Sequence, residues 1–319
     1  MARIVTLTLN PSVDVYGKVE TIQPWHKLRC HDVRRDPGGG GINVARAIRH
    51  LEGKATALYL AGGPTGDQLQ ELLKQDSLEG VRVQTAYCTR ESFVIVETKT
   101  GLEYRYVLPG REIKESEWKE CLDILDRLRP APDYIAASGS LPDGAPVDFY
   151  ARVARMARKM GARLALDTSG DSLKAALEEK VFLLKPNRRE LADLMGGCTE
   201  LEEAEEIARQ MVAEERCEVL ALTLGADGAF LAWEGGTLRV RTPEVKVSSS
   251  VGAGDSFLGG FVLGLSRGKP LTEAFRFGVA AGTAALLTPG TELCRLDDTL
   301  RLYREIGGKG VREDGRLDG

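Results

Sequence analysis

Residues 248–257 read Ser-Ser-Ser-Val-Gly-Ala-Gly-Asp-Ser-Phe, and this stretch decides the fold. Polar residues lead into a turn of small residues, and the apolar run that follows predicts a buried helix. Gly252, Ala253 and Gly254 leave the first backbone N–H groups of that helix bare, and the helix dipole is positive there, so the turn favours an anion. Asp255 beside an anion suits phosphoryl transfer to an alcohol. Asp also simply favours helix starts, and the stretch alone leaves both interpretations open.

Composition describes an ordinary globular protein. The chain has 319 residues, enough for one large α/β domain or two small ones, with 43% hydrophobic and 28% charged residues. A net charge of −4 argues against nucleic acid as a partner, because no basic excess is present to neutralise phosphates. The six cysteines show no C-x-x-C spacing, so we expect reduced thiols rather than disulfides or a zinc site.

No segment of the sequence predicts export or membrane insertion. The first residues, Met-Ala-Arg-Ile-Val-Thr, lack the apolar core and the cleavage site of a signal peptide. No apolar run approaches the roughly 18 residues of a membrane span. We therefore expect a cytoplasmic protein with no membrane partner.

Strands and helices alternate along most of the chain. We expect strands at 4–9, 27–33, 56–61, 133–137, 163–166, 181–184 and 218–223, helices behind the glycines 38–41 and at 67–79, 147–160 and 202–214, and an all-β patch at 83–108 with a hairpin around 99–101. Such alternation predicts a parallel sheet with right-handed crossovers, in which ligands bind beyond the carboxyl ends of the strands. The polar and glycine-rich clusters all fall at that edge, which predicts one shared active site.

Several candidate residues near the N-terminal half have two interpretations. Asp14 follows the first strand and is either a turn carboxylate or an acceptor for sugar hydroxyls. Arg90 and Arg105 lie in the β patch, where the sequence alone favours solvated surface, although both can also fork onto a phosphate. The four glycines 38–41 are costly in backbone entropy unless something approaches the chain closely.

The nucleotide signals are also ambiguous. Asn187-x-x-Glu190 fits a capping box and also a pair of oxygen ligands that serve Mg²⁺ through its waters, and both can hold at once. Thr223, Gly225 and Gly228 form either a loop against a nucleotide or a hairpin turn. No Gly-Lys pair is followed by Ser or Thr, so the chain has no P-loop, and the glycines never fall as G-x-G-x-x-G.

Two stretches closely resemble the signature regions of the PfkB (ribokinase-like) carbohydrate kinases. They are residues 38–45, Gly-Gly-Gly-Gly-Ile-Asn-Val-Ala, and residues 251–256, Val-Gly-Ala-Gly-Asp-Ser. Shorter matches extend the resemblance over about the first 305 residues, at 27–30, 104–105, 138–142, 277–282 and 297–299. The resemblance implies a three-layer αβα sandwich with a mostly parallel central sheet and a small β-sheet lid. It places the kinase domain at 1–306, the lid segments at about 13–35 and 88–109, and a disordered tail at 307–319.

The resemblance also implies roles for the candidate residues. Asp255 would be the base that takes the proton from the acceptor hydroxyl, at an anion hole formed by residues 252–254. The sugar phosphate would bind to Asp14, Gly39, Gly40, Asn43, Arg90, Arg105 and Ser140. Lys27 and Arg29 would reach the site of a partner subunit. ATP would bind to Lys185, Asn187, Thr223, Gly225, Gly228 and Thr283, and Glu190 would organise Mg²⁺ through its waters.

Many members of this family have a monovalent-cation site beside the anion hole, which implies K⁺ as a further cofactor. Its positions here are Ser249, Val251, Ala285, Thr288 and Gly290. Thr288-Pro289 and Glu292 stand where the nearest members have Asn-Gln and Arg, so we expect the acid at 292 to alter the potassium response.

The resemblance implies ATP-dependent phosphorylation of fructose 6-phosphate at its 1-hydroxyl, a reaction of glycolysis. Fructose 1-phosphate and tagatose 6-phosphate are alternative substrates, because they would use the same motifs. A non-catalytic sugar-phosphate sensor is a second alternative, against which the intact Asp255 argues. A dinucleotide-dependent oxidoreductase is a third, and it lacks its glycine fingerprint. The expected partners are the sugar phosphate, ATP and a second copy of the chain, which would pair through the lid as a homodimer.

Overall fold

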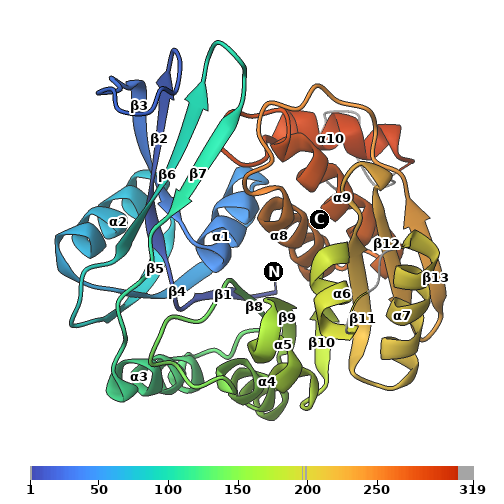
Figure 1. Ribbon diagram of the computed structural model, residues 1–319. Coiled ribbons are helices and arrows are strands. Elements are labelled where there is room, and N and C mark those ends of the chain that lie inside the picture. Colours follow the sequence, from blue (N-terminus) through green and yellow to red (C-terminus); the bar gives the residue numbers. More distant parts are fainter. Residues whose placement is uncertain (1, 196, 198–199, 308–319) are drawn as a thin grey trace.

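A large sheet runs through the middle of the protein (Figure 1). The computed structural model describes residues 2–195, 197 and 200–307, and within these the sheet has nine strands in the order β13-β12-β11-β10-β9-β8-β1-β4-β5. Neighbouring strands from β11 to β5 are parallel, whereas β12 and β13 return antiparallel at one edge. The strands are β1 (Ile4–Thr8), β4 (Thr56–Ala61), β5 (Glu79–Gln84), β8 (Tyr134–Ser138), β9 (Arg163–Asp167), β10 (Val181–Leu184), β11 (Cys217–Thr223), β12 (Ala229–Trp233) and β13 (Gly236–Val240). The expected alternation and the mostly parallel sheet are confirmed.

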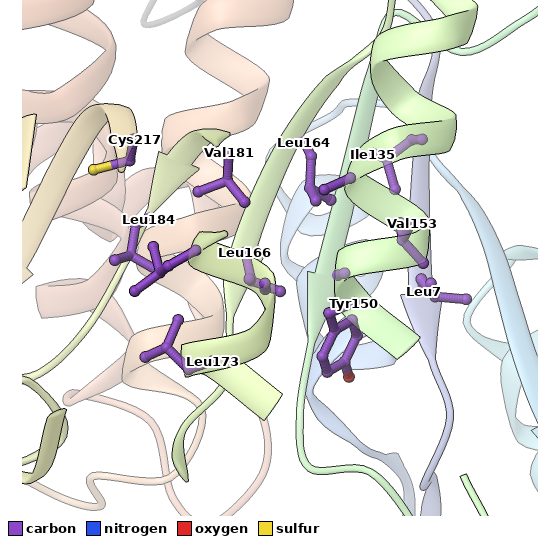
Figure 2. Packing of buried hydrophobic residues seen from close by; sticks show 14 of the residues in the cluster. Leu7, Ile135, Tyr150, Val153, Leu164, Leu166, Leu173, Val181, Leu184 and Cys217 are labelled. Carbon is purple, nitrogen blue, oxygen red and sulfur yellow. The ribbon is translucent and has the colours of Figure 1, made fainter. Parts of the chain in front are cut away.

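Helices cover both faces of this sheet, which gives the expected three layers. Leu7 of β1 packs with Tyr150 and Val153 on one face (Figure 2). Ile4, three residues earlier on the same strand, packs with the helices of the other face. This alternation follows from the two-residue period of a strand. The helices are α1 (Gly40–His50), α2 (Gly63–Gln75), α3 (Glu115–Arg127), α4 (Phe149–Met160), α5 (Gly170–Leu177), α6 (Arg188–Met195), α7 (Leu201–Ala213), α8 (Ala253–Ser266), α9 (Leu271–Ala285) and α10 (Leu296–Glu305).

Helix α8 is the buried helix that the sequence predicts. Phe257 and Phe261 pack edge-to-face with each other and with Phe275 of α9. Gly260 lets the two helices approach closely, because a Cβ on it would lie 2.7 Å from the Cβ of Ala281. The helix that begins at the anion-binding turn is therefore held firmly by its neighbour.

A smaller sheet projects from the body beside α1 and α2 (Figure 1). Its strand order is β3-β2-β6-β7, with β2 (Ser12–Val19), β3 (His31–Gly38), β6 (Arg90–Glu97) and β7 (Glu103–Val107). The β6–β7 hairpin is the one expected around residues 99–101. The strand expected at 27–33 is wrong in its bounds. It begins at His31 and continues to Gly38, because its pairing with β2 runs from Lys18–His31 to Ser12–Gly38.

Other expectations were also inexact. The β patch at 83–108 is not one unit, because β5 pairs with β4 at the edge of the large sheet. Helix α2 begins at Gly63 rather than 67, with a proline in its first turn, a position that tolerates the missing N–H. The expected tail lies outside the described residues from 308 onward, as does Cys198. The cysteines within the described ranges are free, and no helix in those ranges is long and apolar enough to cross a bilayer.

Candidate active site

The N-terminus of α8 is a turn that leaves backbone donors uncovered. Its N-cap, Gly252, has φ 73°, a left-handed conformation that glycine adopts without strain. A Cβ at this position would also lie 2.2 Å from Leu293 Cδ2. Among the described residues no side chain caps the helix start. Gly254 presents its N–H as the sequence predicts, whereas the N–H of Ala253 makes a long hydrogen bond of 3.5 Å to the Ser250 carbonyl, which an anion would have to replace.

Asp255 belongs to the first turn of α8, and two other elements hold its carboxylate. Asn43 of α1 donates from Nδ2 to Oδ2 at 3.0 Å, and the Ser138 hydroxyl, at the end of β8, donates to Oδ1 at 3.4 Å. Burial and the nearby charge of Asp167 raise the pKa of Asp255 to about 6. A carboxyl group with this pKa exchanges its proton near neutral pH, as a general base requires.

An ion pair lies beside the same helix start. Lys185, which follows β10, is buried, and its Nζ lies 3.1 Å from Oδ1 of Asp167 at the end of β9. Burial lowers the pKa of Lys185, but the carboxylates of Asp167 and Glu190 outweigh that effect and raise it. A Cβ on Gly254 would lie 3.4 Å from Nζ of Lys185, so a fixed positive charge stands next to the bare amides. The arrangement attracts an anion.

A polar cavity of about 180 Å³ opens on one side of Asp255. Burial raises the pKa of Asp14, whose carboxylate accepts a 2.6 Å hydrogen bond from Ser12, while the charge of Arg90 acts in the opposite direction. Most of the residues predicted to bind a sugar phosphate line this cavity: Asp14, Gly39, Gly40, Asn43, Arg90 and Arg105.

Arg90 is held in a fixed orientation at this cavity. Its Nε donates to Oδ1 of Asn10 at 3.0 Å, its Nη2 to the Asn10 carbonyl at 3.2 Å, and its Nη1 to Oγ of Ser92 at 3.3 Å. The preference of the sequence alone for solvated surface is wrong for Arg90, which is half-buried, while Arg105 is exposed at the rim. Ser140 lines neither cavity but joins the group, because Asn10 donates to its Oγ at 3.3 Å.

A second, more apolar cavity of about 260 Å³ opens on the other side of the α8 N-terminus. Asn187 and Thr223 are brought together by a β-bridge, and a Cβ on Gly228 would lie 2.1 Å from the Val240 carbonyl. Apolar walls come from Phe257 and Val279. All the predicted nucleotide residues except Lys185 line this cavity: Asn187, Thr223, Gly225, Gly228 and Thr283.

The capping-box interpretation of Asn187 and Glu190 is confirmed. The Asn187 N–H donates to Glu190 Oε2 and the Glu190 N–H donates to Asn187 Oδ1, both at 2.8 Å. Burial raises the pKa of Glu190, and the charge of Asp167 adds to this. In residues 2–195, 197 and 200–307, no three His, Cys, Asp or Glu side chains gather as metal ligands. The residues present therefore fit Mg²⁺ only as an ion that keeps its waters and binds phosphate oxygens.

Two sets of contacts join the segments that carry the residues expected to hold a monovalent cation, which lie before α8 and at and after the end of α9. The N–H of Ser248 donates to the Leu286 carbonyl at 2.7 Å, which brings the segment before α8 against the segment after α9. The Thr288 hydroxyl lies 2.8 Å from the carbonyl oxygens of both Ala285 and Leu293 and can donate its one proton to either. Carbonyl and hydroxyl oxygens are the donors that K⁺ takes, so the set fits that ion in kind. The carboxylate of Glu292 forms an ion pair of 2.8 Å with the guanidinium of Arg34, which balances its negative charge.

Some predicted residues stay apart, and some site residues were missed. Lys27 and Arg29 are exposed before β3 and line neither cavity. Ser138, Asp167 and Asn10 contact site residues but were not predicted to do so. One feature of the sequence could have indicated them: each is a polar residue at the end of a buried strand or just after it, and α/β sheets bind ligands at the carboxyl ends of their strands.

Comparisons with known proteins agree with this geometry. The family model described as pfkB family carbohydrate kinase matches residues 3–298. An "ATP-dependent 6-phosphofructokinase isozyme 2" of Mycobacterium tuberculosis is 42% identical over 303 residues, which are 94% of this chain and 89% of that protein. A "1-phosphofructokinase" of Bacillus subtilis is 36% identical over 91% of this chain and 95% of its own length.

Solved structures of phosphofructokinase-2 from Escherichia coli have the same fold. The complex with potassium has a TM-score of 0.92 at 38% identity and covers 96% of this chain and 100% of that one. The complex with fructose 6-phosphate has a TM-score of 0.90 at 37% identity with the same coverage. A further structure, described as the tetrameric inhibited form, has a TM-score of 0.90 at 38% identity and again covers 96% and 100%.

Proposed function

The chain belongs to the pfkB family of carbohydrate kinases, and from this premise we propose that it transfers the γ-phosphoryl group of ATP to the 1-hydroxyl of fructose 6-phosphate. The observation that carries the proposal is that the N-terminus of α8 borders two cavities, with Gly252 and Asp255 in the wall of the polar one and Ala253 and Gly254 in the wall of the apolar one. One cavity offers two arginines for a phosphate and carboxylate and amide groups for hydroxyls, and the other offers apolar walls for a nucleotide base. The names of the similar 6-phosphofructokinases support the choice of sugar.

The chemistry follows from the groups around α8. Asp255, oriented by Asn43, accepts the proton of the attacking hydroxyl as the new O–P bond forms. The bond between the γ-phosphorus and the β,γ-bridging oxygen of ATP breaks in the same transfer, and ADP leaves with that oxygen. The N–H groups at Gly252 to Gly254 and the ammonium of Lys185 stabilise the negative charge on the migrating phosphoryl group. Because both substrates are held against one helix start, much of the acceleration comes from positioning.

Two ions complete the proposal. Glu190 and the ATP phosphates would hold Mg²⁺ through its waters, and the ion would supply charge neutralisation on the phosphates. The oxygens of Ser249, Val251, Ala285, Thr288 and Gly290 would hold K⁺, whose proximity to the α8 turn would favour the anion there. The potassium complex of the similar E. coli structure supports this second ion.

We expect an acid limb near pH 6 in the pH profile of kcat/KM. The base must be ionised, and the pKa of Asp255 is raised to about 6, so kcat/KM should fall about tenfold per pH unit below that value. Asp167→Asn should move the limb to lower pH, because the charge of Asp167 contributes to the raised pKa. The profile is measured at subsaturating sugar phosphate. A limb that stays near pH 4 in the wild type would assign the base to another group.

A substrate panel tests the proposed reaction. We expect the highest kcat/KM for fructose 6-phosphate, at least tenfold above fructose 1-phosphate and tagatose 6-phosphate, in a coupled assay with ATP and Mg²⁺, run with and without K⁺. A preference for fructose 1-phosphate would contradict the proposal and would indicate the activity named for the 36% identical relative, 1-phosphofructokinase. Binding without ATP turnover would identify a sensor, and tight NAD binding an oxidoreductase.

Homodimerisation through the small sheet and a cytoplasmic location are further parts of the proposal. Trp25, between β2 and β3, is fully exposed at 101%, and Val33 of β3 and Tyr106 of β7 are exposed at 52% and 50%. Exposed apolar side chains of this kind are suited to contact with a second copy. Free thiols support a reducing compartment. Light scattering with and without ATP distinguishes a dimer from the tetramer described for the similar E. coli protein.

A further inference from the structure

The small sheet is tied to the body at both of its edge strands. Arg34 of β3 pairs with Glu292 at 2.8 Å and donates to the Pro289 carbonyl at 3.3 Å. At the opposite edge, Glu103 of β7 accepts a 2.8 Å hydrogen bond from the hydroxyl of Ser249. The two anchor points on the body are the segments on either side of the α8 N-terminus.

The Glu103–Ser249 link continues into the anion-binding turn. Ser249 is buried, and its Oγ accepts the N–H of Val251 at 3.2 Å. A carboxylate can only accept, so it fixes the hydroxyl proton of Ser249 toward Glu103 and leaves the oxygen lone pairs toward Val251. The residue after Val251 is Gly252, where the bare amides begin.

The same strand carries sugar-phosphate contacts. Successive side chains of a strand alternate in direction, so Glu103, Arg105 and Val107 point to one face. Arg105 and Val107 line the polar cavity together with Val251 and Gly252. Glu103 therefore anchors the beginning of β7, and the next two side chains on the same face, Arg105 and Val107, line the polar cavity.

We propose that Glu103 is a positioning residue that couples the placement of Arg105 to the orientation of the anion hole. Its hydrogen bond holds β7 over the polar cavity and at the same time orders residues 249–251. The coupling rests on the proposed function only for its kinetic consequences, because the hydrogen bonds themselves exist without substrate.

Glu103→Ala is expected to raise the KM for fructose 6-phosphate about tenfold and to lower kcat about tenfold, with the KM for ATP changed less than twofold. Glu103→Gln keeps an acceptor oxygen and should recover kcat to within threefold of the wild type. Ser249→Ala removes the other partner, and the double variant should be no worse than the poorer single variant. Multiplying effects in the double variant, a Gln variant as impaired as the Ala variant, or an unchanged Ala variant would each overturn the proposal.

Glu97→Ala is the matched control. Glu97 lies on the neighbouring strand β6 and accepts hydrogen bonds from Ile22 and Thr100, both outside the body of the protein. This variant should leave both kinetic constants within twofold, which separates a general loosening of the small sheet from loss of the Glu103 link.

Hydrogen exchange gives a readout without turnover. In the unliganded protein, Glu103→Ala should speed exchange of the Val251 amide at least tenfold, and Glu97→Ala should not. If the wild type fails to phosphorylate fructose 6-phosphate but this difference is found, the proposed function is wrong and the link stands. If exchange at Val251 is the same in Glu103→Ala and the wild type, the link is wrong whatever the substrate.

Discussion

Asp255→Asn is expected to lower kcat by at least about two orders of magnitude while both substrates still bind. General-base catalysis typically contributes 10²–10⁴-fold, and the amide of asparagine cannot take up the proton. The side chain keeps its size. Nδ2 of Asn43 can still donate to the amide oxygen in the place of Oδ2, and the Ser138 hydroxyl can accept from the amide NH2 in the place of Oδ1. The measurement is steady-state turnover of fructose 6-phosphate together with calorimetric binding of both substrates.

Asp171→Asn is a matched control for this change, because Asp171 is also an acid in the first turn of a helix, but it is exposed on α5. We expect it to keep wild-type turnover. If Asp255→Asn also turns over near the wild-type rate, Asp255 is not the base. If sugar-phosphate binding disappears as well, the acid acts in binding rather than in proton transfer.

Arg90→Ala is expected to raise the KM for fructose 6-phosphate about 30- to 100-fold with little change in kcat or in the KM for ATP. Hydrogen bonds to charged groups contribute about 1.5–3 kcal/mol, and about 1.4 kcal/mol corresponds to a factor of ten. Asn10 and Ser92 already fix the guanidinium at the polar cavity, so little entropy is lost when a phosphate binds. Both substrates are varied in the assay.

Two comparison variants sharpen this test. Arg90→Lys keeps the charge but loses the planar fork, so its KM should lie between those of the wild type and Arg90→Ala. Arg239→Ala removes an exposed arginine of β13 that pairs with Glu205, away from both cavities, and should change nothing. A KM that does not move in Arg90→Ala would leave the phosphate to other groups.

The sequence predicted the frame of the site better than its internal contacts. Strand–helix alternation was sufficient for the parallel sheet, and the turn at 252–254 for the exposed helix start, because both signals are local. The contact of Ser138 with Asp255 joins residues 117 positions apart and depends on the register of β8 against its neighbours. No local pattern reports that register.

Contacts in the folded structure, rather than local sequence patterns, decided between the interpretations of the ambiguous residues. Asn187 and Glu190 form their capping box, as either interpretation allowed. Arg90 becomes half-buried because β6 pairs in parallel with β2, which sets Arg90 opposite Ser12 and brings its guanidinium to Asn10, 80 residues away in the sequence. The start of β3 was misplaced because residues 27–30 have a strand-like pattern but no partner strand among the described residues.

The close contact between α8 and α9, which we call the hydrophobic seam, affects how this enzyme tolerates amino-acid substitutions. Gly260 and Ala281 meet with no room for one more methyl group, and the reacting carboxylate sits at the far end of the same rigid helix. A larger side chain at Gly260 would tilt α8 away from α9. Asp255 is on the same helix, so its carboxylate would move as well. Random mutagenesis should therefore yield variants with lower thermal stability and lower kcat from substitutions between α8 and α9 as often as from substitutions in the cavity walls.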